Sequence, residues 1–283
     1  MKFKLKSIFT IGILMSALLT TAYGAASPNP RPSKPIGIIS AINMETSYLK
    51  KQLQNVKTKK ILGRVYYYGT LKGRNVVIAQ VGIGAINASV GAAILIREFS
   101  PSAVIMTGVA GGTPKTEPGE VIIASKVTFY DFGMLDNKGN FHRAPAYTPT
   151  SDFSGKNVKS APLFFTADNK LLKCAQKVGK TSNFANLRYN NLIYDARAVQ
   201  GIIATSQIFN EYPAQVKAVM KSTGCIAFDM ECAGPAQVCF NQNIPFLTVK
   251  SISDNGDLAM FNALKFISAK NAQILVENII KCL

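Results

Sequence analysis

The residues that decide the fold are 103–112, which read Ala103-Val104-Ile105-Met106-Thr107-Gly108-Val109-Ala110-Gly111-Gly112. The first five form a short, almost wholly apolar run, which is typical of a strand buried on both faces of a parallel sheet. The run leads into a glycine-rich segment, where the backbone must turn or approach another group closely. Ligands of open α/β sheets collect at the carboxyl ends of the strands, so we expect this segment to border a binding site.

Apolar strands of this kind recur along the chain and alternate with segments of helical spacing. The further strands are expected at 36–40, 121–127, 198–205, 226–228 and 246–249, with a hairpin formed by 65–68 and 76–81. The helices are expected at 45–53, 86–99, 169–177, 213–221, 231–240 and 261–282. This alternation predicts a single three-layer α/β domain, in which helices flank a mixed, largely parallel central sheet.

The first 24 residues have the pattern of a signal peptide. Three lysines, at positions 2, 4 and 6, precede an apolar run from Ile8 to Leu19, and small residues follow before Ala25. The run is shorter than the ~20 residues that span a bilayer, so we expect cleavage after Gly24 and no stable membrane anchor. Residues 25–35 read as a Pro/Ser-rich linker and 36–283 as the folded domain, and the protein is expected to be exported, either periplasmic or secreted.

Composition excludes several classes of function. Removal of residues 1–24 lowers the formal net charge from +17 to +14, yet the basic residues are scattered and form no run or aromatic-interleaved stripe, so we expect no nucleic-acid binding. The chain has five cysteines without a CxxC pair and one histidine, His142, so we expect no metal site. Export permits a disulfide, but no pairing can be assigned; Cys232 and Cys239 look like buried helix positions.

Three acidic residues stand where strands are expected to end. Glu45 follows 36–40, Glu231 follows 226–228, and Asp254 follows 246–249. Each has a structural alternative, because the two glutamates suit the first turn of a helix and the aspartate suits a turn. Three acids and a glycine-rich segment at one sheet edge nevertheless favour a catalytic site. Residues 130–165, by contrast, lack a regular pattern and read as a long insertion, of the kind that can close over a site.

The order of these motifs resembles the 5′-methylthioadenosine/S-adenosylhomocysteine nucleosidases, a family of the purine nucleoside phosphorylase superfamily. The resemblance is carried by 36–41 with Glu45, by 81–84, by 107–112, by 228–231 and by 251–254, and it extends from about Ile36 to Leu283. It implies a nucleoside phosphorylase-like fold, a hydrolase that releases the free base of a purine nucleoside, no cofactor and no metal. It also implies a homodimer in which a partner loop completes the pocket.

The resemblance implies a role for each acid. Asp254 matches the acid that protonates purine N7, Glu45 matches the group that activates water, and Glu231 matches the carboxylate that binds the ribose hydroxyls. Breaking the N-glycosidic bond passes through a sugar with oxocarbenium character, which explains the need for both an acid and a base. The further candidates for substrate contact are Met230, Val109, Ala110, Gly111, Phe209, Ser253, Phe261 and Lys250.

Two positions depart from the family pattern. The bacterial nucleosidases usually have Ser at the position of Val109 and Arg at that of Lys250, and Arg and Lys are not equivalent in a fixed hydrogen-bond geometry. Two alternatives therefore stay open: a phosphate-dependent purine nucleoside phosphorylase, which Lys250 and Arg143 could assist, and a non-catalytic nucleoside-binding or storage protein. The sequence leaves open the preferred base and 5′ substituent and the reason for the basic surface.

Overall fold

The computed structural model describes residues 33–145, 162–209 and 212–283. The predicted signal peptide and most of the predicted linker lie outside the described residues, as do 146–161 of the predicted insertion. Within the described part, no helix is both long and apolar enough to cross a membrane.

A mixed sheet forms the centre of the domain, as the sequence predicts, and it contains ten strands of the described residues. Its strands lie in the order β13, β12, β6, β14, β5, β1, β4, β3, β2, with β9 paired to β6. Their bounds are β1 Ile36–Ser40, β2 Gln54–Ile61, β3 Arg64–Leu71, β4 Arg74–Gln80, β5 Ala103–Gly112, β6 Val121–Phe129, β9 Phe165–Thr166, β12 Ala198–Thr205, β13 Ala227–Asp229 and β14 Phe246–Asp254. The central pairs β4–β1, β1–β5 and β5–β14 are parallel, and so is β12 with both of its neighbours.

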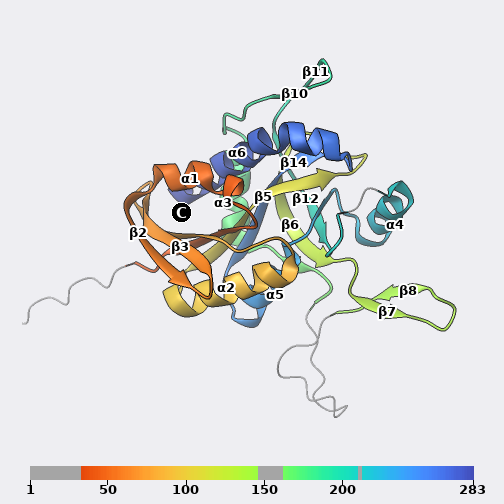
Figure 1. Cartoon of the computed structure of the whole chain (residues 1–283), viewed down its shortest axis with the longest axis horizontal. Helices are drawn as coiled ribbons and strands as arrows, with labels where there is room; N and C mark the ends of the chain where they lie inside the picture. Colours follow the sequence, from red (N-terminus) through yellow and green to blue (C-terminus); the bar gives the residue numbers. More distant parts are fainter. Residues whose placement is uncertain (1–32, 146–161, 210–211) are drawn as a thin grey trace, which may run out of the picture. The chain divides into compact units, whose positions relative to one another are not determined.

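Helices cover both faces of the sheet, which confirms the three-layer prediction (Figure 1). On one face α1 (Ser47–Gln52), α3 (Asn169–Gly179) and α6 (Leu258–Cys282) pack over one apolar core, and on the other α2 (Ala85–Phe99) and α5 (Ala233–Asn241) pack over a second. Asp168 and Asp257 begin α3 and α6 by accepting hydrogen bonds from the first free backbone N–H groups. α4 (Pro213–Thr223) begins with Pro and is capped by Gly224, which has a positive φ.

The sheet closes on itself near the carboxyl end of β5. The short strand β13 pairs in parallel with β12 and antiparallel with β5, where Ala227 faces Gly112 and Phe228 faces Gly111. β5, β14, β6, β12 and β13 therefore form a closed ring of strands. The glycine-rich segment does not turn, as one reading of the sequence allowed; it continues β5 as far as Gly112, and its glycines serve close approach instead.

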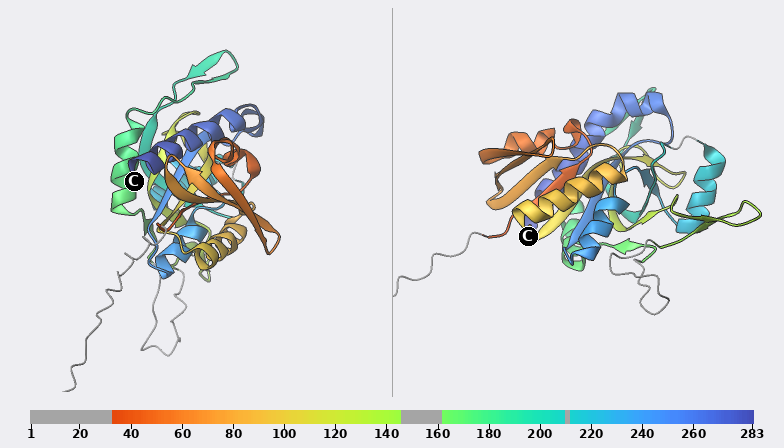
Figure 2. Two further views of the ribbon diagram at one scale, coloured as in Figure 1. Left: turned by 90° about the vertical axis from the view of Figure 1, so that its left-hand side faces the viewer. Right: turned by 60° about the horizontal axis from the view of Figure 1, so that its bottom comes forward.

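Several elements differ from the sequence prediction. β2 is an additional, almost wholly exposed edge strand, and Glu231 precedes α5, which begins at Ala233. The predicted insertion contains the hairpin β7 (Gly133–Leu135) with β8 (Phe141–Arg143), which projects from the sheet, as does the hairpin β10 (Leu187–Tyr189) with β11 (Leu192–Tyr194) (Figures 1 and 2).

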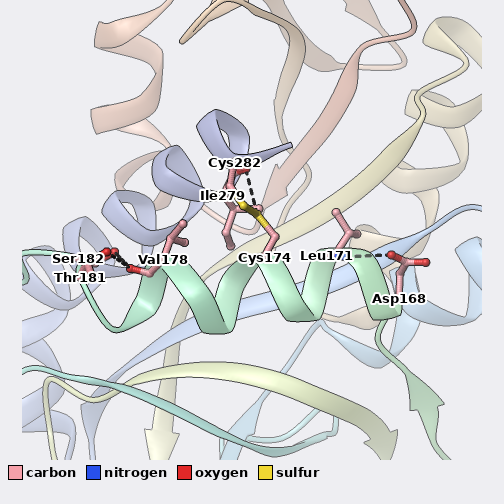
Figure 3. Close-up of a disulfide and its surroundings, with 8 residues drawn as sticks. All are labelled: Asp168, Leu171, Cys174, Val178, Thr181, Ser182, Ile279 and Cys282. Atoms are coloured by element: carbon pink, nitrogen blue, oxygen red, sulfur yellow. Dashed lines mark hydrogen bonds between the residues drawn. A yellow bond between two sulfur atoms is a disulfide. The ribbon is translucent and has the colours of Figure 1, made fainter.

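A disulfide joins α3 to the last turn of α6, between Cys174 and Cys282, whose Cα atoms are 6.2 Å apart (Figure 3). The other three cysteines, Cys225, Cys232 and Cys239, are buried free thiols. The burial predicted for Cys232 and Cys239 is thus confirmed, although Cys232 lies at the N-cap of α5 rather than inside the helix.

Candidate active site

A cavity of about 860 Å³ opens at the carboxyl ends of β5, β13 and β14. Its lining includes ten of the eleven candidate residues of the sequence: Glu45, Val109, Ala110, Gly111, Phe209, Met230, Glu231, Ser253, Asp254 and Phe261. The three acids that follow separate strands therefore meet in one site, as their positions predict.

Glu45 is held rigidly at one end of the glycine-rich segment. Its Oε1 accepts a hydrogen bond from the backbone N–H of Val109 at 2.9 Å, and its Oε2 accepts one from the N–H of Ile42 at 3.0 Å. The residue is buried and belongs to the short 3-10 helix η1 (Asn43–Glu45), which follows β1 directly. Two backbone donors thus fix the carboxylate without help from a flexible side chain.

The close approach of two side chains explains why position 108 of β5 must be glycine. A Cβ atom built there would lie 2.2 Å from Glu45 Oε1 and 3.1 Å from Lys250 Nζ, and the φ of +154° is one that other residues rarely adopt. The missing side chain lets the carboxylate and the ammonium approach the same point of the backbone. The glycine that follows the buried apolar run therefore indicates that side chains approach the backbone closely at this point.

Glu231 lies on the opposite wall, in the segment between β13 and α5. Its Oε1 accepts a hydrogen bond from the N–H of Gly84 at 3.0 Å, and its Oε2 lies 3.2 Å from Lys250 Nζ. Burial raises the pKa of its carboxyl, Lys250 opposes that rise, and the nearby Asp229 and Glu45 carboxylates add to it. Met230, half-buried beside it, also lines the cavity.

Lys250 is the one candidate that does not line the cavity. Its side chain is fully buried, and Nζ lies 3.3 Å from Asp229 Oδ2 as well as 3.2 Å from Glu231 Oε2. Burial alone would lower the pKa of the ammonium, but the surrounding negative groups outweigh it and raise that pKa well above its ordinary value. Lys250 therefore holds Glu231 through a buried ion pair, and its ammonium is already engaged by two carboxylates.

Asp254 is the last residue of β14. It pairs with Gly111 of β5, which lies three residues after Gly108. Its Oδ1 accepts a hydrogen bond from the N–H of Gly256 at 2.9 Å, and its Oδ2 lies 2.8 Å from Ser253 Oγ. Ser253 Oγ is also 3.3 Å from the carbonyl oxygen of Ala110. The hydroxyl can donate to that carbonyl when Asp254 carries a proton and to the carboxylate when it does not, so this pair can hold either protonation state.

Phe209 and Phe261 form an aromatic pair at the cavity, with ring centroids 6.0 Å apart and nearly perpendicular planes. Phe209 is 43% exposed, which is unusual for a phenylalanine that only fills a core. Both residues stand at the site, and the alternative of a core role does not hold for Phe209.

Sequence reasoning missed a second group of lining residues. A fourth acidic residue, Asp229, lines the cavity as well. The other additional lining residues include Ile42, Ile83, Thr113, Thr116, Val216, Lys217, Met220 and Leu258. Val216 and Met220 are spaced four residues apart on α4, so their shared helix face was visible in the sequence, but the element against which that face packs was not.

Arg143 lies outside the cavity. Its guanidinium donates to the carbonyl oxygens of Phe129 and Ser222 and to Thr128 Oγ1. Among the described lining residues, Lys217 of α4 is the sole cation. The cationic groups that the phosphorylase alternative needs beside the sugar are thus absent from the described part of the site.

Comparison with known proteins agrees with this geometry. The model of the phosphorylase superfamily matches residues 35–281. The 5′-methylthioadenosine/S-adenosylhomocysteine nucleosidase of Psychromonas ingrahamii is 33% identical over 251 residues, which cover 87% of this chain and 97% of that protein. The chain belongs to the 5′-methylthioadenosine/S-adenosylhomocysteine nucleosidase family. A second member, from Oceanobacillus iheyensis, is 31% identical over the same share of the chain and 98% of its own length.

Solved structures of the nucleosidase family have the same fold. The Neisseria meningitidis nucleosidase in complex with methylthio-immucillin-A superposes with a TM-score of 0.75 at 27% identity, covering 88% of this chain and 100% of that one. The Colwellia psychrerythraea nucleosidase in complex with adenine gives a TM-score of 0.74 at 27% identity, covering 88% and 96%. The chain is thus an N-glycosyl hydrolase of the nucleosidase type on a nucleoside phosphorylase-like fold.

Proposed function

We propose that this chain hydrolyses the N-glycosidic bond of 5′-methylthioadenosine, S-adenosylhomocysteine or a related purine nucleoside and releases the free base. The observation that carries the proposal is the convergence of Glu45, Glu231 and Asp254 on one cavity, each held by hydrogen bonds of the chain. The similar proteins are 5′-methylthioadenosine/S-adenosylhomocysteine nucleosidases, which supports the substrate class.

The arrangement supports a division of labour among the acids. A ribose between Glu45 and Glu231 would have its hydroxyls bound by Glu231, while the base would extend along β5 to Asp254. Protonated Asp254 gives its proton to purine N7, the C1′–N9 bond breaks, and the bonding electron pair leaves with the base. Glu45 takes a proton from water as the water oxygen forms its bond to C1′, so the products are the neutral base and the free sugar, which keeps its 5′ substituent.

Water is favoured over phosphate as the nucleophile. Glu45 already accepts two backbone hydrogen bonds, and Lys250 is paired with two carboxylates. A phosphate dianion beside Glu45 would meet like charge, and Lys217 of α4 is the sole cation among the described lining residues, so burying the dianion there costs free energy.

The test is base release from the purified protein with 5′-methylthioadenosine, S-adenosylhomocysteine, adenosine and inosine, each with and without phosphate. We expect base release without phosphate. Asp254→Asn should lower its rate about 10²- to 10⁴-fold, since general acid catalysis contributes on that order. Asp195→Asn, the same change at an exposed residue outside the cavity lining, is the control. Release that requires phosphate would make the chain a phosphorylase, and tight nucleoside binding without release would make it a binding protein.

The functional unit is expected to be a homodimer. Ile83, Ile86 and Val90 are 55%, 72% and 41% exposed around the start of α2, and Ile83 also lines the cavity. Adjacent exposed apolar residues are typical of an interface, and a second copy seated there would cover the cavity mouth. Sedimentation equilibrium should give a dimer that Ile86→Glu weakens, whereas Ile193→Glu on β11 should not. A monomeric but fully active wild-type protein would contradict this.

Export is expected from residues 1–24, and the disulfide between Cys174 and Cys282 supports it, because such bonds persist in oxidising compartments. The role would be salvage of external nucleosides. Cell fractionation with N-terminal sequencing should find a chain that begins at Ala25 outside the cytosol. An intact chain in the cytosol would overturn this part of the proposal.

A further inference from the structure

The cavity continues past the residues that the hydrolysis of a simple purine nucleoside requires. Beyond Asp254 it is bordered by Thr113, Thr116, Phe228, Val216 and Met220. We call these five residues the distal compartment. The whole cavity, at about 860 Å³, lies toward the upper end of the ~300–1,000 Å³ that hold drug-sized ligands.

The register of β5 orders the cavity along one line. Gly108 contacts Glu45, Gly111 lies opposite Asp254, and Gly112 packs against Thr116. A strand rises about 3.3 Å per residue, so roughly 10 Å separate the Glu45 end from Asp254 along the backbone. The distal compartment follows immediately, on the side away from Glu45 and Glu231.

The two threonines of the distal compartment have their hydrogen bonds within the chain. Thr116 Oγ1 accepts from the N–H of Thr113 at 3.0 Å and lies 3.0 Å from the carbonyl oxygen of Ile226. Thr113 Oγ1 accepts from the N–H of Lys115 at 3.2 Å. Both hydroxyl oxygens are thus already hydrogen-bonded within the chain.

The remaining members of the distal compartment are apolar and belong to one cluster. Phe228 lies on β13, and Val216 and Met220 of α4 pack against the cluster that contains it. Methionine side chains adapt to ligands of irregular shape because they are unbranched and polarisable. An apolar group placed here would therefore be buried against apolar side chains, which is favourable.

The chemistry of the nucleoside decides which part of it reaches this region. The sugar is attached at N9 and the proton is delivered to N7, so the six-membered ring lies on the side of the base away from the ribose. We propose that the distal compartment accepts an apolar substituent on the six-membered ring, such as an N6-alkyl or N6-benzyl group. This inference rests on the proposed function, because it uses the positions assigned there to sugar and base.

The experiment compares kcat/KM for 5′-methylthioadenosine and for its N6-benzyl derivative. The wild-type protein should hydrolyse both within about tenfold of each other. Val216→Phe, which fills the distal compartment, should lower the ratio of N6-benzyl to unsubstituted kcat/KM by about tenfold or more, the scale of discrimination in an apolar pocket. Ala218→Phe, exposed on the same helix and not part of the cavity lining, should leave the ratio unchanged.

Direct binding separates this inference from the proposed function. Calorimetry with N6-benzyladenine and adenine should show tighter binding of the benzyl base, and Val216→Phe should remove that advantage. Hydrolysis of 5′-methylthioadenosine with neither hydrolysis nor binding of the benzyl compounds would overturn the inference alone. If no nucleoside is hydrolysed, equal or weaker binding of N6-benzyladenine still overturns it, and tighter binding that Val216→Phe abolishes still supports it.

Discussion

Lys250 Nζ lies 3.2 Å from Glu231 Oε2 in a part of the molecule where Lys250 has no exposed surface and Glu231 almost none. Asp229 Oδ2 lies 3.3 Å from the same ammonium, and the Glu45 carboxylate adds to the charges that act on it. One buried ammonium thus interacts electrostatically with several buried carboxylates. The departure from the family's usual arginine preserves the charge and changes the number of donors.

The first prediction concerns removal of that cation. Lys250→Met should destabilise the protein by about 3–5 kcal/mol, because it leaves the buried carboxylates of Asp229 and Glu231 without a cation. Lys250→Arg keeps the charge and matches the residue usual in the family, so its loss of stability should be smaller. Urea unfolding of both variants measures the difference, and equal losses would show that the charge is not what stabilises this region.

The second prediction concerns Glu231 and pH. Burial raises the pKa of this carboxyl above its ordinary value of 4.5, so the folded state holds the proton more tightly than the unfolded state does. The contribution is present in full below the unfolded pKa and is lost as pH rises through the folded one. Relative to Glu231→Gln, the wild-type protein should therefore lose stability as pH increases from about 4.5.

The matched control for the pH prediction is Glu117→Gln, an exposed carboxylate outside the cavity lining. Urea midpoints measured across the pH range should diverge between wild type and Glu231→Gln and remain parallel between wild type and Glu117→Gln. A wild-type protein that gains stability relative to Glu231→Gln over this range would mean that Lys250 outweighs burial.

The third prediction tests the close approach at Gly108. Gly108→Ala would place a methyl group 2.2 Å from Glu45 Oε1, so Glu45 must move; we expect a loss of about 1–3 kcal/mol in stability together with a large fall in kcat. Gly63→Ala is the control, since Gly63 also has a positive φ, of +76°, but no atom within 4 Å. It should lose some stability and keep its activity, and equal activity of the two variants would remove the role assigned to this contact.

The local patterns of the chain predicted much of the fold and site. A buried strand needs only its own run of apolar residues, so β1, β5 and β14 could be located, and with them the acids that follow. The roles of those acids came from the resemblance. Lys250 illustrates the limit: its own sequence neighbourhood is an apolar strand, and the carboxylates that hold it come from β13 and the segment after it.

The closure of the sheet could not be predicted for a similar reason. β13 has only three residues, and it pairs with a segment of β5 that lies more than a hundred positions away in the sequence. Neither segment carries a sequence pattern that predicts this pairing. The distal compartment depends on that closure, because it brings Phe228 and α4 to Gly111 and Gly112. Exposed β2, which consists mainly of polar residues, likewise forms because β3 offers an edge rather than because of its own apolar content.

The fourth prediction concerns the disulfide between Cys174 and Cys282, which closes a loop with a sequence separation of 108 residues. Loops of this length gain the most from a cross-link, so the Cys174→Ala/Cys282→Ala variant should be less stable by about 2–5 kcal/mol. Neither residue lines the cavity, so kcat/KM should be unchanged at a temperature where both proteins are folded. Reductant should destabilise the wild type and leave the double variant unaffected, and thiol titration of the unfolded, unreduced wild type should count the three free cysteines. A count of five, or equal sensitivity to reductant, would contradict the bond and withdraw its support for export, while the roles of Glu45, Glu231 and Asp254 would stand untouched.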